Sequence, residues 1–147
     1  MKTAGLMVLF LLLIFSCKRN TVGVPTSTDK ISALTDKFTY SAKDTIHLVV
    51  SNKTEKDISL FYRCGKFLEM YYQKRTDKNH WSDTLMFDYM TLRCPTFERI
   101  LAHGQVTESS LGAYLFKTKG TFRLIIPYNI PEEAKGGTLT SNSFEIK

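Results

Sequence analysis

The chain of 147 residues is long enough for one domain, and it carries a formal net charge of +6 at pH 7. Its basic residues are scattered and interleaved with acidic ones, as in SNKTEKD and YQKRTDKNHW, which is typical of a solvated surface. The excess of positive charge allows a weak attraction to anionic lipid or polysaccharide, but it does not indicate a nucleic-acid-binding protein.

The first element in chain order is an apolar segment over residues 4–15, preceded by the single charge of Lys2 and followed closely by Cys17. It is about a dozen residues long, against the roughly 20 that span a bilayer, and is typical of a signal peptide. The residues LIFSC at its end resemble a bacterial lipobox, although Phe15 is bulkier than the usual residue at its position. The resemblance implies that residues 1–16 are removed and that Cys17 carries a diacylglycerol. An ordinary secretory peptide and an uncleaved anchor remain the alternatives.

The residues around the lipid site predict where the protein is located. Lipid on Cys17 would hold the protein at a membrane, since each buried CH₂ contributes ~0.8 kcal/mol. Lys18 is not the aspartate that retains lipoproteins at the inner membrane of enterobacteria, so we expect a bacterial cell-envelope protein anchored at the outer membrane. Such a protein has no routine access to nucleic acid. Residues 17–35 are polar and rich in Thr and Ser, which predicts a lipidated cysteine followed by a flexible tether.

Beyond the tether, residues 36–147 contain short strand-like runs separated by turn residues. Val, Ile, Thr, Tyr and Phe dominate these runs, which predicts an all-β domain with antiparallel sheets. In chain order the runs are KFTYSA, DTIHLVVSN, DISLFYRC, FLEMYYQK, LMFDYM, VTESSL, GTFRLIIPYNI and LTSNSFEIK. One further segment, CPTFERILAHG, has a proline near its start and a glycine at its end, so we expect a short turn of helix there.

Several short motifs in this region resemble the bacterial immunoglobulin-like domains common in envelope lipoproteins. They are TY…DTI…VSN at the start, AHGQ in the middle, GTFRL late in the chain and TSNSFEI at the end. The matching residues are Tyr40, Asp44, Asn52, Gly104, Gly120, Phe122, Arg123 and Ser141 to Phe144, whereas His103 replaces the usual proline. The resemblance implies an immunoglobulin-like antiparallel β-sandwich of about seven strands over residues 36–147. It implies little about function, because folds of this kind serve many roles.

Two cysteines remain once Cys17 is lipidated. In an oxidising compartment the default prediction for Cys64 and Cys94 is a disulfide, which would contribute roughly 3 to 4 kcal/mol to stability. Two free thiols or half a metal site are the alternatives, but the three histidines are widely spaced and there is no C-x-x-C pair, which disfavours zinc. Trp81 lies between the cysteines, as in antibody domains, yet their spacing is about half of what an inter-sheet bridge requires. We therefore expect the bond to join the end of a strand to a long connection.

The sequence contains no motif that indicates catalysis. It has no G-x-S-x-G elbow, no H-E-x-x-H helix and no phosphate-binding glycine loop. His80 lies close to Asp77, Ser82 and Asp83, but residues so near in sequence rarely present their side chains as a catalytic set. We therefore expect no enzyme activity, no metal site and no cofactor.

Eight aromatic residues gather within thirty residues of chain, between Phe61 and Tyr89. Tyr and Trp are favoured at binding surfaces, so Tyr72, His80 and Trp81 are the predicted partner-binding residues. Strand alternation must turn about half of these aromatic side chains inward, and core packing is therefore the alternative.

Taken together, these features predict an exported, lipid-anchored and non-catalytic binding or assembly module of the cell envelope. Its expected partners are the membrane, through lipid on Cys17, and another envelope protein or a glycan, contacted by edge strands or loop aromatics. The main alternative is an inhibitor of an envelope-directed protease or lysozyme, with residues 73–93 as the inserted loop. A small hydrolase ranks last.

Overall fold

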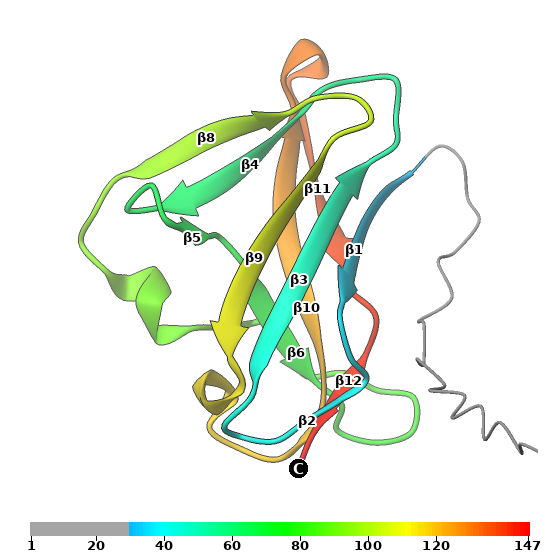
Figure 1. Ribbon diagram of the computed structural model, residues 1–147, viewed down its shortest axis with the longest axis vertical. Coiled ribbons are helices and arrows are strands. Elements are labelled where there is room, and N and C mark those ends of the chain that lie inside the picture. Colours follow the sequence, from blue (N-terminus) through cyan, green and yellow to red (C-terminus); the bar gives the residue numbers. More distant parts are fainter. Residues whose placement is uncertain (1–29) are drawn as a thin grey trace, which may run out of the picture.

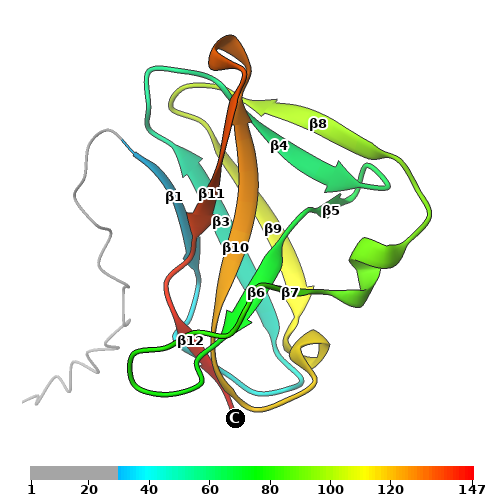
Figure 2. The ribbon, with the colours of Figure 1, turned by 180° about the vertical axis from the view of Figure 1, so that it is seen from behind.

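The computed structural model describes residues 30–147, which form two packed β-sheets (Figures 1 and 2). The predicted signal peptide (1–16), the predicted lipid site at Cys17 and residues 18–29 of the predicted tether lie outside the described residues.

The first sheet has the order β1-β3-β9, with both pairs antiparallel. Its strands are β1 (Ile31–Thr35), β3 (Thr45–Asn52) and β9 (Val106–Gly112). β3 shows the alternation that its sequence predicts, because every second side chain faces the core. The apolar residues of that alternation are fully buried: Ile46, Leu48 and Val50.

The prediction that the tether continues to residue 35 is wrong, because β1 begins at Ile31. Ala33 and Thr35 are buried, and β1 takes its ladder hydrogen bonds from β3. The side chain of Asn142 also holds Thr35 on both sides: Asn142 Oδ1 accepts from the Thr35 N–H at 2.7 Å, and its Nδ2 donates to Thr35 Oγ1 at 2.8 Å. The polar composition of the segment therefore reflects an edge strand with side-chain partners rather than free chain.

The second sheet is built around β10 (Gly120–Ile130). β11 (Lys135–Thr140) and β12 (Phe144–Ile146) pair with one of its edges, and β4 (Ile58–Arg63) and β6 (Tyr71–Lys74) pair with the other. The remaining elements are β2 (Thr39–Tyr40), β5 (Phe67–Leu68), β7 (Leu85–Met86), β8 (Thr96–Leu101) and the 3₁₀ turns η1 (Asp88–Thr91), η2 (Ala113–Phe116) and η3 (Pro131–Glu133).

This strand order is immunoglobulin-like. β1, β3 and β9 correspond to strands A, B and E of one sheet, and β4, β10 and β11–β12 to strands C, F and G of the other. The predicted all-β, immunoglobulin-like antiparallel sandwich is thereby confirmed. The described residues contain more strand segments than the seven of a simple sandwich. Strand G is divided at residues 141–143, the short β2 pairs in parallel with β12, and the chain between β4 and β9 adds β5 to β8.

The motif residues that suggested this fold hold its turns and ends in place. The buried Tyr40 donates its hydroxyl hydrogen to Asp36 Oδ1 at 2.7 Å, and burial raises the pKa of that hydroxyl. The amide nitrogen of the fully buried Asn52 donates to the carbonyl oxygens of Lys56 at 2.8 Å and Leu101 at 2.9 Å. Each of these polar groups is thus satisfied inside the fold.

β4 and β6 occupy one strand position beside β10. The chain from residue 62, near the end of β4, to residue 70, just before β6, turns away from β10. Pro127 of β10 lies opposite Phe61 in this register, and a proline has no N–H to donate to the neighbouring strand. The Phe61 carbonyl instead accepts from the N–H of Glu69 at 2.7 Å, which closes the base of the excursion. A single proline in the central strand thus coincides with the point where the neighbouring strand leaves it.

Candidate functional site

Residues 62–70 and β8 form a ribbon at one side of the sandwich, which we call the side ribbon. β8 pairs antiparallel with β4, and in Figure 1 both strands extend to the left from the upper part of β10. All residues of β8 except Leu101 are exposed. The predicted helical turn over CPTFERILAHG is wrong, because pairing with β4 along the whole of β8 outweighs its helix-like end signals.

The tip of the side ribbon is a tight turn closed by the disulfide. Cys64 and Gly65 both have positive φ angles, 53° and 67°, as in a type I′ turn, and the Lys66 N–H donates to the Arg63 carbonyl at 3.0 Å. Cys64 bonds to Cys94 across 30 residues of sequence, with their Cα atoms 5.2 Å apart. The predicted disulfide is confirmed, and it joins the end of β4 to the connection before β8, as expected.

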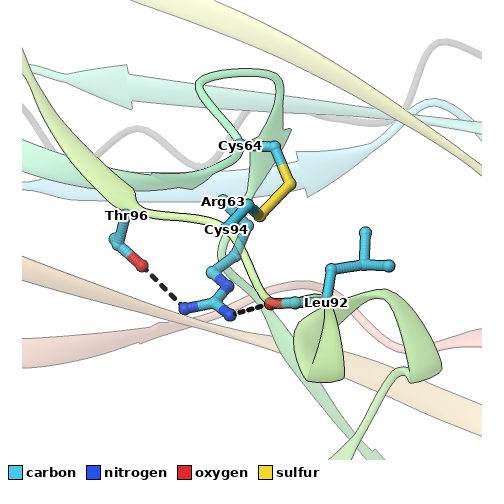
Figure 3. Close-up of a disulfide and its surroundings, with 5 residues drawn as sticks. All are labelled: Arg63, Cys64, Leu92, Cys94 and Thr96. Carbon is cyan, nitrogen blue, oxygen red and sulfur yellow. Dashed lines mark hydrogen bonds between the residues drawn. A yellow bond between two sulfur atoms is a disulfide. The ribbon is translucent and has the colours of Figure 1, made fainter.

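The side chain of Arg63 forms a second set of contacts that joins the same segments as the disulfide (Figure 3). Its guanidinium donates to Thr96 Oγ1 at 3.0 Å and to the carbonyl oxygen of Leu92. The disulfide and the guanidinium together fix the connection between η1 and β8 against the end of β4.

β9 has one edge without a strand partner in the described part of the chain. The Gln105 carbonyl accepts from Asn52 and the Ala113 N–H donates to Asp44, so by ladder alternation the odd-numbered residues bond to β3. The backbone N–H and C=O groups of Val106, Glu108, Ser110 and Gly112 therefore point away from the sheet. An immunoglobulin sheet would carry strand D at this edge, whereas here the chain between β4 and β9 forms β5 to β8 of the other sheet.

A groove of about 610 Å³ lies between this free edge and the side ribbon. Its lining includes the core side chains of Leu68, Met70 and Leu111, together with the rings of Tyr62 and Tyr89. The opening between the two sheets at the position of strand D is therefore apolar in its depth and bordered by unpaired backbone along one side.

Polar groups brace the aromatic walls of the groove. The Tyr62 hydroxyl lies 3.4 Å from Thr107 Oγ1 of β9, which links the two walls. The Tyr89 hydroxyl donates to the Leu68 carbonyl at 3.1 Å, and burial raises the pKa of this hydroxyl. These bonds keep the rings in place while the space between them stays open.

The rim of the groove carries more positive than negative charge. The guanidinium of Arg99 lies 4.5 Å from the centroid of the Tyr62 ring, and the exposed Lys66 also lines the groove. Glu108 is the one acidic residue of the lining in the described chain. An acidic group on a bound molecule would complement the side-ribbon wall.

The sequence analysis did not predict this groove, although the polar residues of VTESSL could have indicated it. Thr107 and Ser109 are polar on the face of β9 that turns toward the other sheet, and they are only half-buried. A strand with polar residues on both faces is the pattern of an edge beside an opening, not of a central core strand.

The structure separates the three predicted partner-binding residues. Tyr72 is partly buried and its ring faces the core, 4.7 Å from Phe87 and 5.1 Å from Phe116, centroid to centroid, so it does not form one exposed aromatic patch with Trp81. Trp81 instead pairs with Arg75, on the opposite face of the strand from Tyr72. Strand alternation is the physical reason, because residues 72 and 75 point to different sides of one strand.

His80 orders the loop that precedes Trp81. Its Nδ1 lies 2.8 Å from Asp77 Oδ1, and Asp77 also accepts from the backbone N–H groups of Asn79 and His80. The hydrogen bond from the Asn79 N–H lowers the pKa of the Asp77 carboxyl most, and the hydrogen bond from the His80 side chain lowers it further. His80 is therefore engaged within its own loop.

Within residues 30–147, no three His, Cys, Asp or Glu side chains gather closely enough to hold a metal ion. Over the same residues, no helix has the length and apolar character needed to cross a membrane.

Comparisons with known proteins add little to these observations. No family model and no curated protein matches the chain. Among solved structures, it is similar to the ASH/PapD-like domain 7 of human CEP192, at 13% identity and a TM-score of 0.37, over 88% of this chain and 94% of that one. It is also similar to a β-glucosidase from Listeria innocua in its glucose complex, at 9% identity and a TM-score of 0.35, over 88% of this chain but 20% of the enzyme. The D270A form of that enzyme with laminaribiose gives 10% identity and a TM-score of 0.33, over 78% and 16%. Likenesses this weak carry no argument about function.

Proposed function

We propose that the protein is a lipid-anchored, non-catalytic binding or assembly module of the bacterial cell envelope, and that its groove receives an extended segment of another envelope protein. In this proposal Cys17 carries the lipid, and the chain after it links the anchor to the domain. The observation that carries the proposal is the unpaired edge of β9 beside an apolar groove, at the position where strand D is missing.

The backbone of β9 favours a strand as the occupant. Its outward N–H and C=O groups can pair with an added strand, a recognition mode in which main-chain hydrogen bonds supply affinity and alternate side chains supply specificity. β9 runs from Val106 to Gly112. At ~3.4 Å per residue its length suits an added segment of about six residues.

The groove also indicates the side chains of that segment. Alternate apolar residues would lie over the floor formed by Leu68, Met70 and Leu111. An acidic residue would lie near Lys66 and Arg99 on the side-ribbon wall.

Site-specific photo-cross-linking in intact cells tests the proposal. A benzoylphenylalanine placed at Phe67 or at Glu108, on the two sides of the groove, should cross-link the same partner. The matched control is the exposed Glu55, in the turn after β3, which should give no such product. Mass spectrometry should locate the cross-link in an extended, alternating segment of the partner.

A proline at the free edge separates strand addition from other contacts. Ser110→Pro removes an outward N–H that no described residue uses, and edge strands tolerate proline at such a position. Partner cross-linking should fall at least tenfold in Ser110→Pro and persist in Ser110→Ala. Equal cross-linking by both variants would refute pairing along β9, and a product of twice the chain's own mass would show that the groove binds a second copy instead.

A further inference from the structure

We infer that Arg75, Trp81 and Arg123 form a phosphate-binding site on the outer face of the second sheet, separate from the groove. The guanidinium carbon of Arg123 lies 4.3 Å from the centroid of the Trp81 ring, and that of Arg75 lies 4.9 Å from it. Two cations thus lie against one indole, which attracts each of them through its π electrons.

The supporting structure fixes these three side chains in place. Trp81 pairs with Arg75 across an isolated bridge, and the Arg123 Nε donates to Gln73 Oε1 at 2.8 Å. Arg123 and Trp81 are both half-buried, and the loop between Arg75 and Trp81 is ordered by Asp77. Such preorganisation lowers the entropy that ligand binding would otherwise cost.

Neither arginine has an acidic partner within the described chain. The ion pairs there are Lys56–Glu133, His80–Asp77, Lys117–Asp88 and Lys147–Glu145. The Arg75 guanidinium makes no hydrogen bond to the described residues, and Arg123 uses only its Nε. The terminal N–H groups of two guanidiniums that contact the same indole ring are therefore free for a ligand.

The arrangement selects the chemistry of that ligand. Two positive charges at one indole ring favour an anion, and guanidinium N–H groups match the spacing of oxygens on a phosphate. We expect the phosphate to lie at the edge of the ring and to accept from both arginines. Because the two guanidiniums lie against the indole, the ring is less available for stacking on a sugar. The phosphate could belong to a membrane phospholipid headgroup or to a small phosphate ester.

Trp81 is the one tryptophan of the chain, so its fluorescence reports directly on this site. The full chain in an uncharged detergent is titrated with inorganic phosphate, and with sodium chloride at matched ionic strength. We expect a saturable change in Trp81 emission with phosphate alone. A change that does not saturate, or that chloride reproduces, would overturn the inference.

Substitutions then assign the response to the arginines. Arg75→Gln with Arg123→Gln should weaken phosphate binding at least tenfold, and Arg75→Gln alone, at an exposed position, should weaken it several-fold with the fold intact. Lys53→Gln, which removes one exposed charge from the turn after β3, is the matched control and should leave binding unchanged. Equal weakening by Lys53→Gln would show that net charge and not this site binds phosphate. No weakening by Arg75→Gln would show that Arg75 does not contact the phosphate, and it would overturn the two-arginine site.

Vesicles distinguish the two sources of phosphate. If a headgroup is the ligand, vesicles containing phosphatidylglycerol should change Trp81 emission in the unmodified chain but not in the double variant, whereas phosphatidylcholine vesicles should not. A response to inorganic phosphate without a response to vesicles would identify a small phosphate ester. No response to either probe would refute the site, and it would leave the proposed groove untouched.

Discussion

Removing the disulfide tests how the side ribbon is stabilised. The bond closes a loop of 30 residues between Cys64 and Cys94, for which the chain-entropy relation gives about 3.6 kcal/mol at 25 °C. We expect Cys64→Ser with Cys94→Ser to lower the free energy of unfolding by about that amount. For a domain of this size the melting temperature should fall by roughly 10 to 15 °C.

Urea unfolding followed by Trp81 fluorescence measures this effect. Both proteins should carry Cys17→Ser, so that no third thiol can exchange with the pair. The loss should come mainly from the unfolded chain, because β8 keeps its pairing with β4 and Arg63 keeps its bonds in the folded state. The urea dependence of unfolding should therefore steepen as the unfolded chain becomes more exposed.

A loss below about 1 kcal/mol would refute the chain-entropy reasoning for this loop. A double variant much less stable than the chemically reduced protein would instead show that serine disturbs the packing at these positions. Reduction should also weaken partner cross-linking through the groove, because the disulfide fixes one of its walls.

Three further predictions concern the core and its pH dependence. Phe122→Ala should cost roughly 3 to 5 kcal/mol in urea unfolding, because the fully buried ring contacts three other aromatic rings, whereas a loss under about 1 kcal/mol would contradict its central place. Asn52→Ala should cost about 1 to 3 kcal/mol, since one buried and one partly buried carbonyl lose their donor, and an unchanged melting temperature would contradict this. Burial raises the pKa of the Tyr89 hydroxyl, so the folded protein keeps the hydroxyl proton at pH values where the unfolded chain has released it. The free energy of unfolding should therefore be unaffected by Tyr89 below about pH 10 and should fall above it. Tyr89→Phe should flatten that fall in unfolding measured from pH 8 to 11, and an equally steep fall would assign it to other groups.

Much of the sandwich could be predicted from the sequence because its strands carry their own patterns. Residues 45–52 alternate between apolar and polar, and GTFRLIIPYNI is rich in the residues that favour strands, so both segments form strands in the structure. Cys64 and Cys94 could be predicted to form a disulfide because the predicted lipid on Cys17 leaves them as the one remaining cysteine pair.

The predictions that failed concern segments whose structure depends on a neighbour. Thr96–Leu101 has helix-like end signals, yet it is a strand because it pairs with β4 along its whole length. Ile31–Thr35 looks like tether, yet Asn142 and β3 supply its hydrogen bonds. The inward direction of the Tyr72 ring could not be predicted, because a sequence gives the alternation of a strand but not which face meets the core.

The sequence by itself determined the all-β composition, the strand patterns and the cysteine pair. The strands depend on residues that are close together in sequence, and the cysteines have one dominant chemistry, disulfide formation. Only the tertiary structure decided the two candidate sites. The groove exists because the chain between β4 and β9 joins the second sheet and leaves β9 without a strand D. Arg123 reaches Trp81 only because β6 and β10 are paired, although the two residues are 42 positions apart in sequence (123 − 81). Both sites depend on which strands become neighbours, and that choice is made by packing the whole core.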